Sequence, residues 1–525
     1  MAIMVILTAD QMRRIDERSE RDHGIPSETL MDNAGREIAS ALLRRFPDLP
    51  SRRILILCGR GNNGGDGITA ARHLRSHGVA ARVVLLGAEH DLRGAAAWAF
   101  QKARSEGIPF EEVVDDAAWA AVRRRLPEHD LIVDALLGTG TRGAASGRMK
   151  EAIEAINGAG CDVVSVDIPS GLDGSEASVP GACVEADITI ALAALKIAHV
   201  FPPACRRAGR VEVVDIGIPA AAFAAEKVDL CWSDASLIAP LVPSRDPFSH
   251  KGDFGHVLIL AGSRGKSGAA VLMARACLRS GAGLVTVAAP ASAQPLIAAG
   301  VAEAMTEALP ETPSGALARR GLPLLEDLAA SRDVLAAGPG LGTDPETAEV
   351  VRAVASGAGK PMVLDADALN ILAAERGSIT NLRAPAILTP HPGEAARLLG
   401  MKVSEVQADR LAAARKIALA WGSCVILKGH RTLVAEPSGR VRVNATGNAG
   451  MATGGSGDVL SGIVAAWLAQ GLTPFDTAAL AAYVHGLAGD LAAADLGEIS
   501  LTAGDIVEYL PRAYRALVEA RPAER

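Results

Sequence analysis

A glycine-rich segment that leads into an acidic residue has the clearest chemical character in this sequence. Gly454, Gly455 and Gly457 stand within four residues, and Asp458 follows directly. Apolar residues at helical spacing come next, so the glycines lie just before or within the first turn of a helix. Backbone N–H groups there can surround an anion, and the positive end of the helix dipole assists them.

The acid in this segment indicates which reaction the anion takes part in. A carboxylate at Asp458 would repel a phosphate unless it takes a proton from the group that attacks the phosphorus. An anion-binding loop combined with a base therefore predicts phosphoryl transfer to a hydroxyl group. The alternative is an ordinary Gly-rich loop followed by an acidic first helical turn.

A second polar segment, 59–67 (GRGNNGGDG), follows a predicted strand at 53–58 and precedes a predicted helix at 68–77. With the next strand at 82–86 this forms a βαβ unit, which predicts a parallel sheet. No acid closes that second strand, so a dinucleotide fingerprint of the ordinary kind is a poor match. Its Asn and Asp residues instead predict a polar site at the mouth of the sheet, although Asn-Gly and Asp-Gly pairs also form plain turns.

Two further strands, 131–136 and 163–167, also end in polar loops. Carboxyl ends of parallel strands share one edge, so Asn63, Asp134, Asp167 and Ser170 are expected to converge there. Two carboxylates in one crevice repel each other unless a proton or a cation lies between them. Lys196 follows the strand at 188–192; an exposed surface lysine is the preferred interpretation, and a place in the crevice is the alternative.

The elements that position these residues form two α/β domains. In the first half, helices are expected at 8–21 and 27–45, with Thr8 and Ser27 as N-caps, before a sheet of about six strands that ends at 211–215. Strand–helix alternation is lost at 217–235, and the domain boundary is expected near 225–235. The second half is predicted to be another doubly wound domain, with strands at 255–262, 284–288, 334–337, 361–364, 386–388 and 424–427.

Composition excludes several classes of protein. The chain has 525 residues, a net charge of −7 and 3% aromatic residues, which argues against a nucleic-acid surface. Its seven cysteines form no CxxC pair and are interpreted as small apolar residues of a reducing compartment. The apolar start at 1–7 lacks the features of a signal peptide, and the run at 188–195 is too short to span a bilayer. A cytoplasmic protein without membrane or nucleic-acid partners is expected.

Several long motifs carry a resemblance to known families. The segments GGSGDVLSG (454–462), KGHRT (428–432), TPHPGE (389–394) and GPGLG (338–342) resemble the ADP-dependent NAD(P)H-hydrate dehydratases, which are ribokinase-like. The segments GRGNNGGDG (59–67), DALLGTGTRG (134–143) and VDIPSGLDG (167–174) resemble the NAD(P)H-hydrate epimerases. Found in this order along nearly the whole chain, they are similar to the bifunctional NAD(P)H-hydrate repair enzymes of bacteria.

The resemblance implies two domains, a Rossmann-like epimerase at 1–225 and a ribokinase-like dehydratase at 230–525. The substrates implied are hydrated NADH and NADPH, with ADP as co-substrate, K⁺ in the first domain and Mg²⁺ in the second; a homo-oligomer is also expected. In the epimerase, Asp167 is the implied acid/base and contacts the substrate, and K⁺ binds Asn63, Asp134 and Ser170. The other implied hydrate-binding residues there are Asn62, Asn63, Gly64, Gly65, Asp66, Gly138, Thr139, Gly140, Thr141, Arg142, Gly143 and Ala144.

In the dehydratase, the resemblance implies that Asp458 is catalytic and contacts the hydrate together with Ala269, Gly340 and His391. The implied nucleotide-binding residues are Lys428, Gly429, His430, Arg431, Thr432 and Gly457. Asp458 would deprotonate the ring hydroxyl for attack on the β-phosphate of ADP, and the phosphate would then leave, giving NAD(P)H, AMP and phosphate. The alternatives are a small-molecule kinase with an accessory nucleotide-binding domain, and a nucleotide-sensing protein that has lost one activity.

Overall fold

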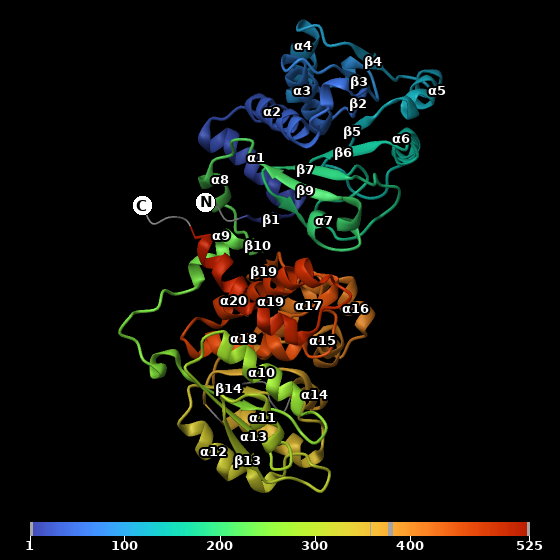
Figure 1. The fold of residues 1–525 in the computed structure, drawn as a ribbon. Helices are drawn as coiled ribbons and strands as arrows, with labels where there is room; N and C mark the ends of the chain where they lie inside the picture. Colours follow the sequence, from blue (N-terminus) through green and yellow to red (C-terminus); the bar gives the residue numbers. More distant parts are fainter. Residues whose placement is uncertain (1–3, 358, 376–381, 522–525) are drawn as a thin grey trace. The chain divides into compact units, whose positions relative to one another are not determined.

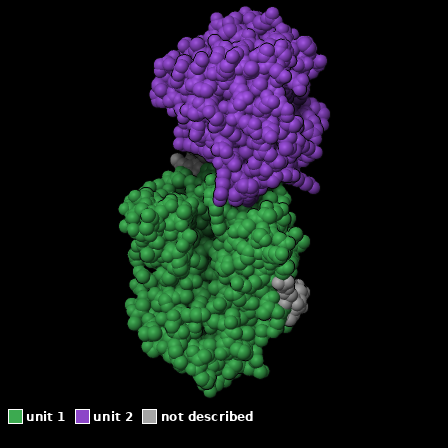
Figure 2. All heavy atoms as spheres, turned by 90° about the vertical axis from the view of Figure 1, so that its right-hand side faces the viewer, with its two compact units in different colours: residues 1, 229–525 green, residues 2–228 purple. Residues whose placement is uncertain are grey.

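The structure is a computed structural model that describes residues 4–357, 359–375 and 382–521. Residues 1–3 of the apolar start, and the outer ends of the two expected domains, lie outside these ranges. The chain divides into two compact units, one ending at Val228 (the N-terminal unit) and one beginning at Asp229 (the C-terminal unit), coloured separately in Figure 2.

A seven-stranded parallel sheet forms the middle of the N-terminal unit (Figure 1). Its order is β4-β3-β2-β5-β6-β7-β9, which is the Rossmann order with one strand added at the β9 edge. The strands are β2 (Ile54–Cys58), β3 (Ala81–Leu85), β4 (Phe110–Glu112), β5 (Leu131–Ala135), β6 (Asp162–Val166), β7 (Ile188–Leu192) and β9 (Arg210–Val214). The predicted Rossmann-like fold is confirmed, but the prediction of about six strands missed β4, which has only three residues, none of them buried.

Helices cover both faces of this sheet, because alternate residues of its strands are buried on opposite sides. Ile54 and Ile56 of β2 belong to the core formed with α1–α4, whereas Leu55 and Leu57 pack with α5 and α6. The helices are α1 (Ala9–His23), α2 (Ser27–Arg45), α3 (Asn62–Ser76), α4 (Gly94–Ser105), α5 (Asp116–Arg125), α6 (Gly147–Asn157), α7 (Ile197–Val200) and α8 (Ala220–Ala224). A short pair, β1 (Ile6–Leu7) with β8 (Leu195–Lys196), lies apart from the main sheet.

The helix starts differ from the predictions in two places. Thr8 caps α1 as expected and forms a capping box with Gln11. Ser27 is not the cap of α2, because Pro26 occupies the N-cap position and fixes the extended backbone there. Helix α3 begins at Asn62, so the segment expected to be a turn as far as residue 67 contributes the first turns of a helix instead.

The C-terminal unit contains a ten-stranded sheet in the order β10-β19-β18-β17-β16-β15-β14-β11-β12-β13. The strands are β10 (Leu230–Ser233), β11 (His256–Leu260), β12 (Leu284–Pro290), β13 (Met305–Leu309), β14 (Val334–Ala337), β15 (Met362–Leu364), β16 (Ala386–Leu388), β17 (Cys424–Leu427), β18 (Leu433–Ala435) and β19 (Val441–Asn444). The predicted α/β fold is confirmed. Most neighbouring strands of this sheet are parallel, but β18 is antiparallel to both β17 and β19.

The predicted strand pattern missed four strands of this sheet: β10, β13, β18 and β19. Strand β10 lies inside the stretch 217–235 that was expected to lack regular structure, and it pairs with β19 over four residues. Strand β13 has mostly partly exposed or exposed residues, and β18 has three residues, so neither gives a strong periodic signal.

Helix α18 (Ser456–Ala469) lies in the core of the C-terminal unit together with α10 (Ser267–Arg279), α19 (Pro474–Leu496) and α20 (Ala503–Glu519). The remaining longer helices are α11 (Gln294–Gly300), α12 (Leu322–Ala330), α13 (Pro345–Gly357), α14 (Ala366–Ala374), α15 (Pro392–Leu399), α16 (Val403–Ala408) and α17 (Arg410–Trp421), besides the short α9 (Ala235–Ile238). Among the described residues, no helix combines the length and the apolar character that crossing a membrane requires.

Candidate functional site

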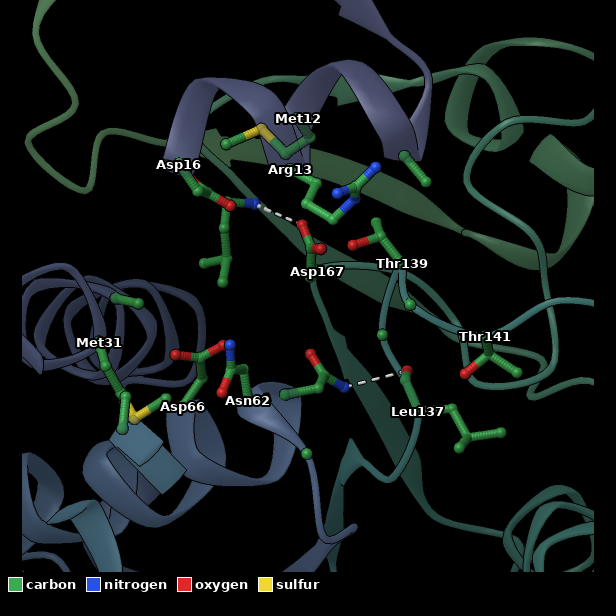
Figure 3. Close-up of a pocket in the computed structure, with 18 of the residues that line it drawn as sticks. Met12, Arg13, Asp16, Met31, Asn62, Asp66, Leu137, Thr139, Thr141 and Asp167 are labelled. Atoms are coloured by element: carbon green, nitrogen blue, oxygen red, sulfur yellow. Dashed lines mark hydrogen bonds between the residues drawn. The ribbon is translucent and has the colours of Figure 1, made fainter. Parts of the chain in front are cut away.

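A cavity of about 680 Å³ lies at the carboxyl ends of the strands in the N-terminal unit (Figure 3). Strands β2 and β5 are neighbours in the sheet, and the chain proceeds from them in opposite directions, to β3 and β4 on one side and to β6, β7 and β9 on the other. Such a switch point opens a crevice between the loops that follow the two strands, and it is where open α/β sheets bind ligands. The loops after β2 and β5 both line the cavity.

Asp167, directly after β6, is held by a buried lysine. The Lys196 ammonium donates hydrogen bonds to Asp167 Oδ1 and to the Leu192 carbonyl, the latter at 2.7 Å. Lys196 is 0% exposed and lines the cavity, so the preferred interpretation of it as a surface lysine is wrong. The reason is tertiary: the cost of burying an ammonium is offset because the Asp167 carboxylate faces it.

Asp167 has a backbone conformation that is uncommon for a residue other than glycine, with φ at 62°. Its N–H donates to the Ile190 carbonyl at 2.8 Å, and its Oδ1 accepts from the Leu192 N–H at 3.0 Å. These bonds fix the carboxylate between two strand ends. Strained backbone that is held in this way is typical of functional sites.

Two further carboxyl groups, Asp16 of α1 and Asp66 of α3, point into the same cavity (Figure 3). Burial raises the pKa of Asp16 to about 7, with Asp167 and Glu17 adding to the shift and Lys196 opposing it. Burial also raises the pKa of Asp66 well above its ordinary value, and Asp167 and Asp16 add to that shift. The cavity therefore contains carboxyl groups that differ in how readily they lose a proton.

Asp134 lies beneath the cavity in a group of oxygen atoms. Its two oxygens accept hydrogen bonds from Ser165 Oγ at 2.8 Å, from the Ser170 N–H at 2.9 Å, from Ser170 Oγ at 2.5 Å and from the Leu136 N–H at 3.2 Å. Burial raises the pKa of Asp134 and these bonds oppose the rise. Asn63 Nδ2 donates to the Leu137 carbonyl at 3.0 Å. The structure thus brings Asn63, Asp134 and Ser170 together, as the strand-end pattern predicted.

The negative charges of Asp134 and Asp167 each have partners within the protein, whereas the sequence suggested a shared proton or a cation between them. Asp167 has Lys196 as its ion-pair partner, and Asp134 accepts four hydrogen bonds. Repulsion between these two carboxylates therefore does not by itself require a monovalent cation.

The remaining expected hydrate-binding residues of this unit lie in two segments. Asn62, Asn63 and Asp66 of α3 line the cavity, whereas Gly64 and Gly65 are buried in the packing of that helix. A side chain at Gly64 would place its Cβ 1.9 Å from the Gly59 carbonyl oxygen, so the close approach of backbone to backbone requires glycine there. In the loop after β5, the cavity is lined by Gly138, Thr139, Gly140, Thr141 and Arg142; the same loop continues through Gly143 and Ala144.

In the C-terminal unit, Asp458 lies in the first turn of α18. Gly455 is the N-cap of this helix with φ at 92°, a left-handed conformation that favours glycine. Burial raises the pKa of Asp458 to about 7; Asp365, Asp367 and Glu394 add to the rise, and Lys428 opposes it. A carboxylate with a pKa near neutrality can both take and release a proton at physiological pH, as a general base requires.

Lys428, at the end of β17, lies among acidic groups next to α18. Its ammonium is 2.8 Å from Asp365 Oδ1 and 3.8 Å from Glu394 Oε2. Burial acts to lower the pKa of Lys428, but Asp365 and Glu394 more than offset this effect, so the lysine stays charged. A Cβ at Gly457 would lie 3.2 Å from this ammonium, which places the lysine directly beside the glycine-rich turn.

Asp365 connects this lysine to α18, because Ser461 Oγ donates to Asp365 Oδ2 at 2.7 Å. His391 is the N-cap of α15, and its Nδ1 accepts from the Gly393 N–H at 2.9 Å. Burial lowers the pKa of His391, and the nearby Lys428 and Arg397 add to this effect, so its ring is neutral at pH 7. Its Nε2, 3.3 Å from Glu394 Oε1, therefore carries the proton.

Gly340 and Ala269, both expected to contact the hydrate, lie side by side. A Cβ at Gly340, where φ is 67°, would be 3.2 Å from the Ala269 Cβ and 2.8 Å from the Lys266 carbonyl oxygen. Ser263 Oγ donates to the Gly340 carbonyl at 2.7 Å. Asp367 accepts from the Gly342 N–H at 2.8 Å and also raises the pKa of Asp458, so these loops lie within electrostatic range of α18.

The turn 428–432 is held from below by Arg410, which is buried. Its guanidinium donates to the carbonyls of Leu427 and Lys428, each at 3.2 Å, and to that of His430. Within the turn, Thr432 Oγ1 donates to the Gly429 carbonyl at 2.9 Å. The Arg431 guanidinium lies 4.4 Å from the centre of the Trp232 ring. Five of the six expected nucleotide-binding residues thus form one hydrogen-bonded turn, and the sixth, Gly457, lies in the first turn of α18.

Several residues of the two sites were not assigned any role from the sequence: Asp16, Asp365, Glu394, Arg410 and Ser461. Asp365 directly follows β15, and Glu394 lies in the first turn of α15 after β16, so both belong to polar segments at strand ends of the kind that identified Asp134. Asp16 and Arg410 lie inside helices far along the chain from the residues that they face, and no local pattern identifies them.

Comparisons with known proteins match both units. The family described as NAD(P)H-hydrate dehydratase matches residues 257–512, and the family described as YjeF-related protein N-terminus matches residues 27–198. The chain is 44% identical to the Bifunctional NAD(P)H-hydrate repair enzyme Nnr of Moorella thermoacetica, over 98% of each chain. It is 36% identical to the enzyme of that name from Escherichia coli, over 96% of this chain and 93% of the other.

Among solved structures, the chain is similar to an ADP/ATP-dependent NAD(P)H-hydrate dehydratase from Bacillus subtilis that was co-crystallized with ATP and Mg²⁺. The identity is 31%, the match covers 55% of this chain and 98% of that chain, and the TM-score is 0.48.

Proposed function

The chain belongs to the bifunctional NAD(P)H-hydrate repair enzymes, and on this premise we propose how its two units divide the work. The enzyme repairs hydrated NAD(P)H by epimerisation and by nucleotide-dependent dehydration. We assign epimerisation to the N-terminal unit, which contains the matched residues 27–198, and dehydration to the C-terminal unit, which contains 257–512.

For the epimerase we propose that the hydrated dinucleotide binds in the cavity at the switch point. The first turn of α3, from Asn62 to Asp66, and the loop 138–144 hold the dinucleotide. Asp167 contacts the hydrated ring and moves its protons. The support is geometric: both segments border one cavity, and Asp167, fixed by Lys196 and by the Leu192 N–H, points into it.

We propose that K⁺ binds next to this cavity, at Asn63, Asp134 and Ser170. Side-chain oxygens and the Leu137 carbonyl lie together there around a fully buried carboxylate, a donor set that suits a hard cation. Bound K⁺ would supply positive charge next to the loop 138–144.

For the dehydratase we propose that the Asp458 carboxylate takes the proton of the ring hydroxyl. The hydroxyl oxygen then attacks the β-phosphate of ADP, and AMP departs. The phosphate leaves the ring carbon as the ring nitrogen donates its electron pair, which yields NAD(P)H. The N–H groups of 454–457 and the Lys428 ammonium face the negative charge that develops.

We propose that the adenine nucleotide binds along the turn from Lys428 to Thr432 and at Gly457, and that Ala269, Gly340 and His391 contact the hydrate. The support is that the turn 428–432 meets the N-terminus of α18 through Lys428. Mg²⁺ usually binds through one or two carboxylates together with substrate phosphates. Asp365 and Glu394, on either side of Lys428, fit such a site, and the ion would neutralise phosphate charge.

The position of Asp458 carries this proposal. A half-buried carboxylate in the first turn of an anion-binding helix, with its pKa raised to about 7, is suited to deprotonating a hydroxyl beside a phosphate. The test is to incubate the protein with hydrated NADH and either ADP or ATP, and to follow the return of NADH absorbance. Faster recovery with ADP supports the assigned co-substrate, and no recovery with either nucleotide contradicts the proposal.

Two expectations about the whole protein stay predictions from the sequence. These are a homo-oligomeric state and a cytoplasmic location. The molar mass in solution, measured by light scattering, tests the first, and fractionation of the source cells tests the second.

A further inference from the structure

The cavity of the N-terminal unit contains the carboxyl group of Asp16, to which the proposed function assigns no role. Asp16 lies on α1, outside the residues 27–198 that match the epimerase family. It lines the cavity and points toward the space that Asp66 and Asp167 also face (Figure 3). Among the described residues, no hydrogen bond or ion pair to Asp16 is formed, so nothing in the fold explains why a carboxyl group is placed there.

The charged groups around Asp16 come from every element that faces it. Lys196 of β8 and Asp167 after β6 act on it most strongly, then Glu17 of its own helix, and Asp66 of α3 interacts with it as well. Asp10, Arg13 and Arg142 line the outer part of the cavity. Burial raises the pKa of Asp16 to about 7, so the group exchanges a proton at neutral pH.

Asp167 is oriented so that one of its oxygens remains for the substrate. Its Oδ1 accepts from both the Lys196 ammonium and the Leu192 N–H. Within the described part of the chain, Oδ2 has no hydrogen-bond donor. A base directed in this way can take a proton from a water molecule or a hydroxyl group in the cavity.

Epimerisation needs two such groups. The hydrated carbon bears a hydroxyl group and is bonded to the ring nitrogen, so its configuration changes when the C–O bond breaks and a new one forms on the other face. The leaving hydroxyl must gain a proton, and the water that adds must lose one. Because the reaction is reversible, the two groups exchange these roles between the two epimers.

We propose that Asp16 is the second acid–base residue of epimerisation and acts together with Asp167 from a different wall of the cavity. The inference rests on the assignment of epimerisation to the N-terminal unit. Asp16 comes from α1 and Asp167 from the end of β6, so the two carboxyl groups can reach a planar ring from different directions (Figure 3).

Every proton and electron pair in this step is accounted for. The protonated Asp16 gives its proton to the hydroxyl, which leaves as water with the electron pair of the C–O bond, while the nitrogen lone pair forms a C=N bond. Water then adds to the opposite face, and the nitrogen regains its pair. Asp167 takes the released proton. The resulting form, with Asp16 ionised and Asp167 protonated, acts on the opposite epimer, and exchange with solvent restores the first form.

Asp66 is less suited to this role. Burial and the neighbouring Asp167 and Asp16 raise its pKa well above the ordinary value, which favours the protonated form. The protonated form can donate a hydrogen bond to the substrate but does not act as a base.

The test uses the full chain without nucleotide, so that the dehydratase is silent, and follows the interconversion of a single NADH-hydrate epimer by chromatography. Asp16→Asn keeps the shape of the side chain but cannot exchange the proton. Its kcat should fall by about 10²-fold or more, with KM changed far less. The matched control is Glu17→Gln, which removes an exposed carboxylate from the next position of the same helix.

The pH profile separates a catalytic from a structural effect. Asp16 and Asp167 together must hold one proton for the reaction to proceed in either direction. Asp16 loses its proton as pH rises through about 7, so kcat/KM of the unmutated enzyme should fall there for both epimers. Asp16→Asn should lack this fall in rate, whereas Glu17→Gln should keep it at a slightly lower pH, because Glu17 raises the pKa of Asp16.

Folding of the N-terminal unit in each variant is checked by thermal unfolding followed by circular dichroism, and dehydration of the S epimer with ADP shows that the C-terminal unit is intact. An Asp16→Asn protein that epimerises as fast as Glu17→Gln, with the fall in rate intact, would overturn the role of Asp16 alone. Unmutated protein that dehydrates the S epimer but never interconverts the epimers would overturn the assignment of the N-terminal unit and this inference with it.

Discussion

At the scale of single residues, both sites combine a carboxylate with a lysine, which is buried in the N-terminal unit and half-buried in the C-terminal unit. Lys196 contacts Asp167 in the N-terminal unit, and Lys428 contacts Asp365 in the C-terminal unit. A buried ion pair adds little net stability, because desolvation of the charges offsets their attraction. What it provides here is a fixed charge next to Asp167 and Asp458, the residues proposed to transfer protons. We therefore assign the lysines to the proposed chemistry of the sites rather than to their stability.

The first prediction concerns Asp458. Asp458→Asn keeps the shape and the hydrogen-bonding capacity of the side chain but cannot take the hydroxyl proton, so dehydration should slow by about 10²–10⁴-fold. Nucleotide binding should persist, because the backbone N–H groups and Lys428 remain. The mutant is given a single epimer with ADP, and both products are followed by chromatography. The expected product is a mixture of epimers without NADH; NADH formed at the unmutated rate would exclude Asp458 as the base.

The pH dependence of dehydration follows from the same group. Burial raises the pKa of Asp458 to about 7, and only its ionised form accepts a proton. The rate should therefore be low below pH 7 and rise as pH passes through about 7. Lys428 lowers this pKa, so Lys428→Met should shift the rising limb to higher pH, whereas Lys428→Arg should keep it in place. The measurement is kcat/KM for dehydration from pH 5 to 9, and a limb unmoved by Lys428→Met would refute this coupling.

A third prediction concerns potassium. If K⁺ binds at Asn63, Asp134 and Ser170, epimerisation should slow in potassium-free buffer, and dehydration should not. Asp134→Asn removes the buried negative charge, so the remaining epimerase activity should no longer respond to added K⁺. Melting temperature serves as the control, because Asp134 also accepts hydrogen bonds from Ser165 and Ser170. Unchanged activity of the unmutated enzyme without potassium contradicts the cation site.

At the scale of elements, the position of Asp458 depends on how closely α18 approaches α10. Gly462 makes this approach possible, because a Cβ there would lie 2.2 Å from the Met273 carbonyl oxygen and 2.9 Å from the Ala276 Cβ. The atoms in the way are backbone and a short side chain, neither of which can move aside. Gly462 thus allows α18 to pack close to α10, and this close packing determines where the first turn of α18 places Asp458.

The prediction at this scale is that Gly462→Ala moves α18 outward. Overpacking of this kind costs about 1–3 kcal/mol of unfolding free energy, and dehydration should fall with it. Epimerisation should be unchanged, because its residues lie in the other unit. Gly357→Ala is the matched control, since a Cβ at that position in α13 meets nothing within 4 Å. Thermal unfolding and both activities are measured; equal stability of the two mutants would disprove the packing argument.

At the scale of the whole molecule, the chain consists of two units with separate sheets and separate cores. Strand β10 begins the C-terminal unit, pairs with β19 and forms the edge of the ten-stranded sheet. A cut before residue 229 leaves this strand in place, whereas a cut beyond residue 233 removes one of the two partner strands of β19.

We therefore predict that fragments 1–228 and 229–525 fold separately, the first retaining epimerisation and the second dehydration. A fragment that begins at residue 240 should unfold at lower temperature than 229–525, because the β19 backbone keeps β18 but loses β10, one of its two partner strands. Circular dichroism melts and activity assays of the three fragments provide the measurement. If both long fragments are insoluble while the full chain is active, the two units are not independent.

The sequence alone determined the features that depend on neighbouring residues. The strands at 334–337, 386–388 and 424–427 have the predicted boundaries, because each is a short apolar run next to a glycine, proline or polar turn. The polar loops after parallel strands identified Asn63, Asp134 and Ser170 as neighbours, since such strands end at one edge of the sheet. Helix α18 followed from its apolar spacing in the same way.

Only the tertiary structure decided the features that depend on distant residues. Lys196 is buried because Asp167, 29 residues earlier, provides its counter-charge. Lys428 meets Asp365 across 63 residues, and Asp16 reaches the cavity on a helix whose own sequence contains no site pattern. The antiparallel edge at β18 depends on pairing with β17 and β19. Helical and strand periodicity describe which face of an element is buried, but the charge that lies opposite that face is set by the packing of the whole chain.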